Sequence, residues 1–425
     1  MTVDPAPDTA NVLALAIAAA ATAGVILRPR GLPEAIWAVA GAILLVVFGL
    51  LPWQMALAGV RAGLDVYLFL LGMMLLSEVA RETGLFDWLA AIATAYAKGS
   101  ASRLFLLIYG VGTLVTIFLS NDATAVVLTP AVAAAARSAR VRNPLPYLLI
   151  CAFVANAASF VLPISNPANL VLYGKNMPPL FEWLPLYLLP SAIAIIATFL
   201  LLRWTQRAEL AGEVARDVPR PRLSAGGHAA GLGIIATAVL LLTVSAFDIP
   251  LGLPTAIAGV LTALLTLLVE RASPLKIIRG VSWGVLPLVA GLFVLVEALD
   301  HAGVISELAG EIDRAVRIWR DSAALGAGVV IAFASNLMNN LPAGLVAANA
   351  MHSAQALPEL FRRAVLIGVD VGPNLSVTGS LATILWLAAL RREGIKVGAG
   401  AFLKTGMIVM PPALLLALCA AWLTR

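Results

Sequence analysis

Three consecutive polar residues interrupt an apolar stretch in the first third of the chain. Ser120, Asn121 and Asp122 lie between residues 104–119 and 123–136, which are almost wholly apolar. At membrane depth a charged side chain costs about 2.5 to 3.5 kcal/mol on insertion scales, so such residues usually line a pathway. We interpret this triplet as one half of a binding site.

The triplet has a counterpart in the second half of the chain. Asn339 and Asn340 precede an apolar run as Asn121 and Asp122 do. The separation along the sequence between Glu78 and Glu297 is nearly the same as that between Asn121 and Asn339. The separation between residues 156–169 and residues 370–383 is slightly shorter. These matches indicate a duplicated unit of more than two hundred residues.

Each polar motif is predicted to begin a half-helix. Asn, Asp and Ser are favoured N-caps and Pro is favoured in the first turn. The predicted caps are Asn121 or Asp122 before Ala123, Asn166 before Pro167, Asn340 before Pro342, and Ser380 before Leu381.

Four such N-termini would converge on one cavity. Their free amide groups would favour oxygen-bearing or anionic ligands, and unwound carbonyl groups would hold a cation or accept hydrogen bonds from hydroxyl groups. The alternative is that these residues only cap broken helices. The predicted substrate-binding residues are Ser120, Asn121, Asp122, Asn156, Ser165, Asn166, Asn169, Asn339, Asn340, Asp370, Thr378, Gly379, Ser380 and Thr383.

Asp122 and Asp370 are the carboxylates within these motifs. Because a buried carboxylate resists ionisation, either could carry a proton across the membrane. Asp122 could instead serve only as an N-cap. Glu78 and Glu297 lie near the ends of apolar runs, and we interpret them as interfacial and solvated.

The composition predicts a polytopic membrane protein. The 425 residues are 61% hydrophobic and 12% charged, with a mean hydropathy of +0.96, whereas a soluble domain has about 25% charged residues. The first ten residues carry no basic residue, so the opening apolar run is predicted to be a span and not a signal peptide.

Enzymatic and metal-binding signatures find little support. The sequence has no His-Glu-x-x-His helix, no Gly-x-x-x-x-Gly-Lys loop and no metal-spaced cluster around its three histidines. Cys151 and Cys419 are too far apart in the sequence to suggest a thiolate site. We expect no cofactor, no metal and no nucleic-acid partner.

The apolar runs predict an all-α fold of two repeats. Each repeat would have five crossings, a re-entrant hairpin and a broken helix, giving about ten spans and two hairpins. The expected domains are residues 1–204, a cytoplasmic linker at 205–228, and residues 229–425. Residues 85–97 and 304–319 are predicted to be amphipathic interfacial helices. Because five is odd, the second repeat would be inverted.

The distribution of basic residues predicts the orientation. With both termini outside, twenty of the 28 lysines and arginines fall on the inner side. The first hairpin would then enter from the cytoplasm and the second from outside.

Three motifs carry a resemblance to a known family. Ser-Asn-Asp-Ala-Thr-Ala-Val-Val-Leu-Thr-Pro from Ser120, Met-Asn-Asn-Leu-Pro from Met338, and the run from Gly368 to Trp386 resemble ArsB-type arsenite efflux permeases of the ion transporter superfamily. The resemblance implies extrusion of arsenite and antimonite across a bacterial inner membrane in exchange for protons, optionally energised by the soluble ATPase ArsA. Arsenite at neutral pH is chiefly an uncharged trihydroxide, which agrees with motifs that contain no lysine or arginine.

The resemblance leaves alternatives open. ArsB-type sequences tend to have Asp-Thr-Ala-Ser where this chain has Asn156-Ala-Ala-Ser159, which leaves Asp122 and Asp370 as the proton-coupling candidates. Residues 163–169 are similar to the pattern of sodium/proton antiporters and dicarboxylate carriers of the same superfamily. A sodium/proton antiporter or a sodium-coupled dicarboxylate carrier is therefore the second hypothesis, and a membrane-embedded acid–base enzyme is the third.

Overall fold

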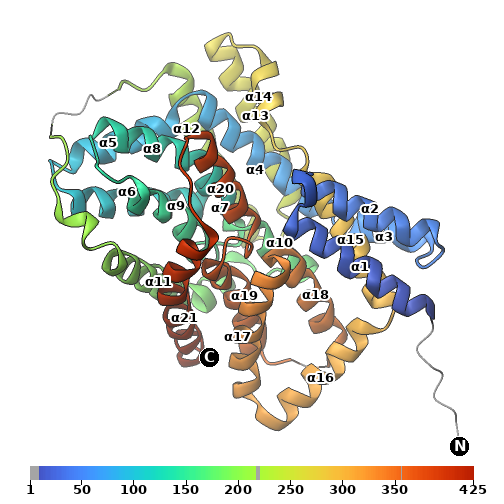
Figure 1. The fold of residues 1–425 in the computed structure, drawn as a ribbon. Coiled ribbons are helices and arrows are strands. Elements are labelled where there is room, and N and C mark those ends of the chain that lie inside the picture. Colours follow the sequence, from blue (N-terminus) through green and yellow to red (C-terminus); the bar gives the residue numbers. More distant parts are fainter. Residues whose placement is uncertain (1–8, 217–220, 356) are drawn as a thin grey trace, which may run out of the picture.

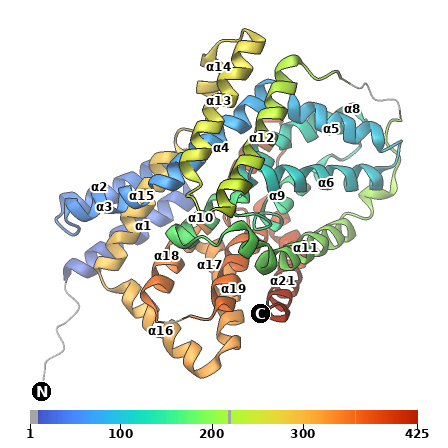
Figure 2. The same ribbon diagram turned by 180° about the vertical axis from the view of Figure 1, so that it is seen from behind.

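The computed structural model describes residues 9–216, 221–355 and 357–425, which form a bundle of helices (Figures 1 and 2). Within these described ranges, eight helices are long and apolar enough to cross a membrane, or up to nine if α3 (Trp53–Ala62) and α4 (Leu64–Glu82), bent by 46°, form one span. The chain is thus an all-helical, multi-pass membrane protein, as its composition predicts.

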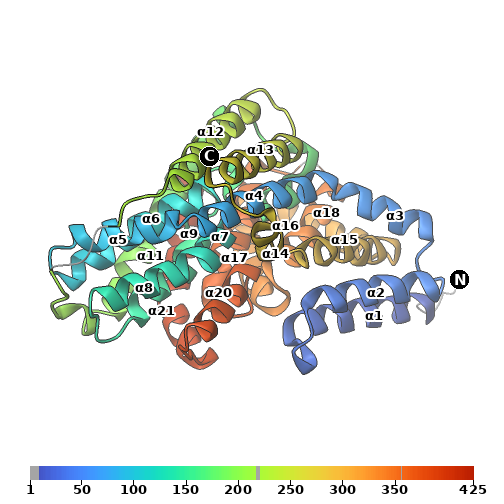
Figure 3. The same ribbon diagram turned by 90° about the horizontal axis from the view of Figure 1, so that it is seen from above.

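Eight helices form what we call the flanking unit. They are α1 (Thr9–Leu27), α2 (Glu34–Val47), α3 and α4 from the first half, and α12 (Ala225–Ala246), α13 (Gly252–Glu270), α14 (Pro274–Gly280) and α15 (Val285–His301) from the second. Helix α4 packs on α13, and α15 packs on α2, so each half of the chain supports the other. Figure 3 shows α1, α2, α3 and α15 gathered at one end of the molecule.

Glycines allow these two helix crossings to be close. A Cβ atom on Gly72 of α4 would lie 2.2 Å from the carbonyl oxygen of Thr255 in α13. A Cβ atom on Gly291 of α15 would lie 2.7 Å from the carbonyl carbon of Ala38 in α2. Small residues at crossings are the usual means by which membrane helices approach each other. Gly72 and Gly291 are separated along the chain by the same offset as Glu78 and Glu297, so they would occupy equivalent positions in the predicted duplication.

The remaining long helices form a central unit. Its first half contains α6 (Ala101–Phe118), α7 (Asn121–Ala123), the π-helical turn η2 (Thr124–Leu128), α8 (Thr129–Ser138), α9 (Leu145–Ala157), α10 (Pro167–Tyr173) and α11 (Leu180–Thr205). Its second half contains α17 (Asp321–Met338), α18 (Asn340–Ser353), α19 (Glu359–Val371), α20 (Leu381–Arg392) and α21 (Ala399–Leu423). The breaks between α9 and α10 and between α19 and α20 lie where the sequence predicts them.

Short helices complete the chain. Helices α5 (Leu85–Tyr96) and α16 (Val304–Trp319) match the two predicted amphipathic segments. Helices α3 and α14 were not predicted as separate elements, because each is short and lies beside a bend or a turn. The 3-10 turns are η1 (Pro29–Gly31), η3 (Pro163–Ser165), η4 (Gly174–Asn176), η5 (Glu209–Ala211) and η6 (Gly372–Leu375).

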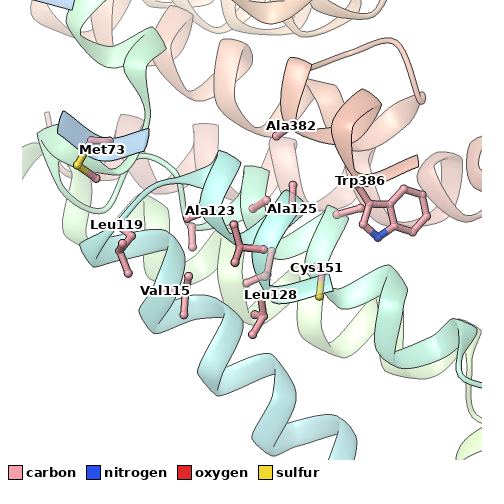
Figure 4. Close-up of a cluster of buried hydrophobic side chains, with 14 of the residues drawn as sticks. Met73, Val115, Leu119, Ala123, Ala125, Leu128, Cys151, Ala382 and Trp386 are labelled. Carbon is pink, nitrogen blue, oxygen red and sulfur yellow. The ribbon is translucent and has the colours of Figure 1, made fainter. Parts of the chain in front are cut away.

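Apolar packing positions the first hairpin inside the central unit. Figure 4 shows Ala123, Ala125 and Leu128 between Val115 of α6 and the side chain of Cys151 in α9. Farther out, Trp386 of α20 is fully buried and donates a hydrogen bond from Nε1 to the carbonyl oxygen of Leu148, at 2.8 Å. The hairpin tip is therefore held against both broken helices.

Candidate functional site

The first hairpin turns at Ser120. The hydroxyl group of Ser120 accepts a hydrogen bond from the backbone N–H of Ala123 at 3.2 Å, so Ser120 is the N-cap of α7. The prediction that Asn121 or Asp122 caps this helix is therefore wrong. Asn121 is buried and Asp122 is half-buried. Between the two arms, the hydroxyl groups of Thr116 and Thr124 lie 2.8 Å apart and share a hydrogen bond.

The first break is tied to this hairpin. Asn166 caps α10 as predicted, since its Oδ1 accepts from the backbone N–H of Ala168 at 3.0 Å. Asn169 donates from Nδ2 to the carbonyl oxygen of Ser159 at 2.9 Å. Ser165 donates from Oγ to the carbonyl oxygen of Ile117 at 2.9 Å, and Ile117 lies at the end of α6. The hairpin tip and the first break thus lie at the same depth.

The second hairpin has the same relation to the second break. Asn339 caps α18 by accepting from the backbone N–H of Leu341 at 3.3 Å, so the prediction that Asn340 is the cap is wrong. The backbone N–H of Asn340 donates to the carbonyl oxygen of Gly379 at 2.8 Å. Thr378 donates from Oγ1 to the carbonyl oxygen of Asn336 at 2.9 Å.

A buried carboxylate joins the two breaks to each other. Asp370 of α19 is fully buried, and its Oδ1 accepts from Oγ of Ser159 at 2.7 Å and from Nδ2 of Asn166. These contacts connect α19 with both ends of the first break.

An amide network makes the second connection between the breaks. Asn156 donates from Nδ2 to Oδ1 of Asn374 at 3.0 Å and to Oγ1 of Thr383 at 3.4 Å. Asn374 donates in turn to the carbonyl oxygen of Phe153 at 3.0 Å. Ser380 caps α20 as predicted, accepting from the backbone N–H of Thr383 at 3.1 Å. The sequence motifs from both halves therefore meet in one polar core.

This polar core holds spare acceptors. Buried oxygen atoms without a hydrogen-bond partner among the described residues are Oδ1 of Asn121, Oδ1 of Asn156, Oδ1 of Asn169 and Oδ2 of Asp370. Such atoms can accept from a hydroxylated ligand, bind a small cation, or, on Asp370, take up a proton. No group of three or more His, Cys, Asp and Glu suited to a metal ion occurs in the described ranges.

A small cavity lies where the central unit faces helix α4. It has a volume of about 60 Å³, and Ser120 and Asp122 line it opposite Ser77 and Glu78. Pro167 at the start of α10 also contributes to its wall.

A larger cavity of about 840 Å³ continues along the same two helices. Leu70 of α4 and Pro167 of α10 line the small cavity, whereas Leu68 and Leu170 line the large one. The large cavity also reaches α18, at Leu345, Ala348, Asn349 and His352. The two cavities thus follow each other along α4 and α10.

Sequence reasoning missed four residues of this site. Ser159 lies inside the matched segment at 156–169, and Asn374 lies inside the segment at 370–383, so the duplication contained the signal for both. The sequence pattern pointed less clearly to Asn336 and Glu78 as residues of the site. Glu78 is 5% exposed and lines the small cavity, so its interpretation as a solvated interfacial residue is wrong.

Comparisons with known proteins agree with this architecture. The model of the citrate transporter family matches residues 13–368. An "Arsenical pump membrane protein" of Escherichia coli K12 is 29% identical over 416 residues, covering 93% of this chain and 95% of that protein. Its namesake from Yersinia enterocolitica is 29% identical over 360 residues, covering 82% and 84%. These relatives confirm the resemblance to arsenical pump proteins.

Solved structures share the fold. The YdaH transporter of Alcanivorax borkumensis has a TM-score of 0.57 at 16% identity, covering 88% of this chain and 87% of its own. MtrF of Neisseria gonorrhoeae has a TM-score of 0.52 at 13% identity, covering 88% and 82%. The apolar helices, the polar core and the similarity to transporters together indicate a membrane transporter and not an enzyme. The chain belongs to the citrate transporter family.

Proposed function

We propose that this transporter extrudes arsenite and antimonite from the cytoplasm in exchange for protons. The similarity to arsenical pump membrane proteins extends over 93% of the chain, including both hairpins and both breaks. The predicted substrate-binding residues, from Ser120 to Thr383, are proposed to bind the metalloid or to support the residues that bind it.

The small cavity is the observation on which this proposal rests. Its volume of about 60 Å³ suits a small species, and its polar lining consists of hydroxyl groups and two carboxylates, Asp122 and Glu78. An uncharged trihydroxide can donate hydrogen bonds to such oxygen atoms. A multiply charged anion would be repelled by the same carboxylates.

Two carboxylates are proposed to couple transport to protons. Asp122 faces the cavity, where a proton and a substrate could compete for it. Asp370 lies in the buried network and keeps one oxygen without a partner among the described residues. Protonation of either group removes a charge from the interior, which lowers the free energy of moving the central unit through the membrane.

The cellular setting is part of the proposal. The protein is placed in a bacterial inner membrane with residues 1–204 and 229–425 as inverted repeats, both termini outside and the linker at 205–228 in the cytoplasm. The proposal includes a soluble ArsA-type ATPase as an optional energising partner.

One observation favours a second candidate, a sodium/proton antiporter or a sodium-coupled carboxylate carrier. The matching family model is described as a citrate transporter, and citrate is a carboxylate. The unpartnered amide oxygens of Asn121, Asn156 and Asn169 are hard oxygen ligands that would suit a sodium ion.

Uptake into inverted membrane vesicles tests the proposal. A proton gradient is imposed, arsenite accumulation is measured, and wild type is compared with Asp122→Asn and Asp370→Asn. We expect accumulation that collapses with a protonophore and is lost in at least one variant. Absence of arsenite movement in wild type, with proton flux on adding sodium or a dicarboxylate, would select the second candidate.

A further inference from the structure

Glu78 is a buried carboxylate held by one arginine. It lies in the last turns of α4, and its Oε2 accepts a hydrogen bond from Nε of Arg81 at 2.9 Å. A second guanidinium nitrogen of Arg81 contacts Oε1 of Glu78 and also Oε1 of Glu82, the latter at 2.6 Å. The Arg81 side chain is 43% exposed, whereas the Glu78 side chain is 6% exposed. The pair therefore connects the protein surface with the interior.

The inner end of this pair reaches the small cavity. Glu78 and Asp122 are the ionisable side chains among the described residues that line it. The lining from α10, α14 and α20 is Pro167, Gly280 and Leu385, which carry no charge. A water needs roughly 10–15 Å³ of such space, so a cavity of about 60 Å³ has room for water between the two carboxylates.

The end of α14 fixes the position of the Glu78 carboxylate. A Cβ atom on Gly280 would lie 1.6 Å from Oε1 of Glu78, so the backbone of α14 is in direct contact with that oxygen. Gly280 and Ser282 are exposed and also line the cavity, which places its mouth at the α14 side of the molecule.

We propose that Glu78 is a further ionisable residue of the transport path, which passes the coupling proton from Asp122 to the α14 side. This inference rests on the proposed function. The O–H bond of protonated Asp122 breaks, a bridging water relays the proton, and an O–H bond forms on Glu78. Asp122 is left as a carboxylate, and Glu78 then releases the proton to water at the α14 side and pairs again with Arg81. Arg81 thus favours the release of the proton by Glu78.

Glu78→Gln tests the relay, because glutamine keeps the size of the side chain but cannot release a proton. Two reactions are measured in vesicles: exchange of labelled for unlabelled arsenite without a proton gradient, and accumulation driven by the gradient. Because Glu78 also lines the substrate cavity, we expect exchange to be reduced but to persist, and accumulation to fall at least tenfold further than exchange does. Glu78→Asp should restore part of the accumulation, with a shifted dependence on pH at the α14 side.

Two neighbouring glycines provide a matched pair of variants. Gly280→Ala forces the Glu78 carboxylate from its place and should reproduce the loss of accumulation. Gly284 belongs to the same turn, but a Cβ atom there meets nothing within 4 Å. Gly284→Ala should behave as wild type, which separates displacement of Glu78 from a general effect on this turn.

Three results would overturn the inference. The first is accumulation in Glu78→Gln at the wild-type rate. The second is a loss of accumulation no larger than the loss of exchange in a variant that is inserted and folded. The third is an equal effect of the two alanine substitutions. If wild type moves no arsenite, the proposed function fails by itself. Proton flux driven by citrate is then measured with the same variants, and an unchanged flux in Glu78→Gln would overturn the role of Glu78 separately.

Discussion

At the scale of single residues, Asp370 combines two properties that are separable by substitution. One carboxylate oxygen accepts hydrogen bonds from Ser159 and Asn166, and the other has no partner among the described residues. The first oxygen stabilises the contact between the breaks, and the second is free to take a proton.

We predict that Asp370→Asn and Asp370→Ala differ in stability but not in proton coupling. Asparagine can keep an oxygen towards Ser159 and Asn166, so the free energy of unfolding should change by less than about 1 kcal/mol. Alanine leaves the Nδ2 group of Asn166 without its acceptor, whereas the Ser159 hydroxyl group can still donate to the carbonyl oxygen of Asn156 at 2.7 Å, so the substitution should cost about 1 to 3 kcal/mol. Thermal unfolding in detergent measures the first difference, and proton-driven uptake should be lost in both.

The comparison of Asp370→Asn with Asp370→Ala is itself the control for this prediction. Equal loss of stability in the two variants would mean that the carboxylate charge, and not its hydrogen bonds, stabilises the junction. Wild-type uptake by Asp370→Asn would leave Asp122 as the proton carrier in the proposed mechanism.

The sequence predicted those polar residues whose roles are local. Asn166 and Ser380 are N-caps, and capping depends on residues two or three positions away. The caps at the hairpin tips were displaced by one or two residues, because the backbone there turns sharply: Asn339 has φ of 74°. The contact between Asn156 and Asn374 joins the two halves of the chain, and no spacing rule predicts which amides meet.

At the scale of elements, helix α11 contains a proline whose missing hydrogen bond is replaced from another helix. Pro190 has no N–H group, so the carbonyl oxygen of Leu186, four residues earlier, has no helical donor. Arg363 of α19, which is 1% exposed, donates from Nη2 to that oxygen at 2.6 Å. Arg363 also donates to the carbonyl oxygen of Thr424 at 3.1 Å, after the end of α21. One side chain thus joins three helices.

We predict that Arg363→Met lowers the free energy of unfolding by about 2 to 4 kcal/mol, because several hydrogen bonds from a charged group are lost. In the background of Pro190→Ala the same substitution should cost about 1 kcal/mol less, roughly one hydrogen bond, since the alanine supplies a backbone N–H that can bond to Leu186. Denaturation of the four proteins of this double-mutant cycle in detergent measures the coupling. If the effects of the two substitutions on the free energy of unfolding simply add, Arg363 does not replace the helical hydrogen bond that Pro190 removes.

The elements missed by sequence analysis were the shortest ones. Helix α14 has seven residues and follows the turn after α13, so its apolar pattern is too short to separate from its neighbours. Helix α3 merges with α4 in sequence, and the bend of 46° between them depends on packing against α15. Long apolar helices such as α1 and α21 were found because length alone identifies them.

At the scale of the whole molecule, the two halves are fastened by equivalent glycine crossings. We predict that Gly72→Ala or Gly291→Ala lowers the melting temperature in detergent and the folded yield, because each new methyl group meets the backbone of a partner helix at 2.2 or 2.7 Å. Overpacking of this kind costs about 1 to 3 kcal/mol. Gly110→Ala in α6 is the control, because a Cβ atom there meets nothing within 4 Å. Equal tolerance of all three substitutions would show that the crossings can loosen freely.

Contacts at the open ends of the two hairpins mark two sides of the molecule. Arg425 is paired with Asp321 at the start of α17, where the second hairpin opens. The Oγ of Ser102, at the start of α6 where the first hairpin opens, donates to the carbonyl oxygen of Leu210 in the linker at 3.1 Å. In Figure 1 α16 and the C-terminal end of α21 lie in the lower part, whereas α5, α8 and α14 lie in the upper part.

The excess of basic residues on the linker side predicts which side is cytoplasmic. Alkaline phosphatase fused after Arg425 should be active and green fluorescent protein fused there should be dark, because the C-terminus is then outside. The same two reporters inserted after Gly212 should give the opposite pattern, since the linker carries the positive charge that stays inside. A fluorescent C-terminal fusion would show that the orientation is the reverse of the predicted one. The small cavity with Glu78 and Asp122 would then open outwards, and protons would reach Glu78 before they reach Asp122.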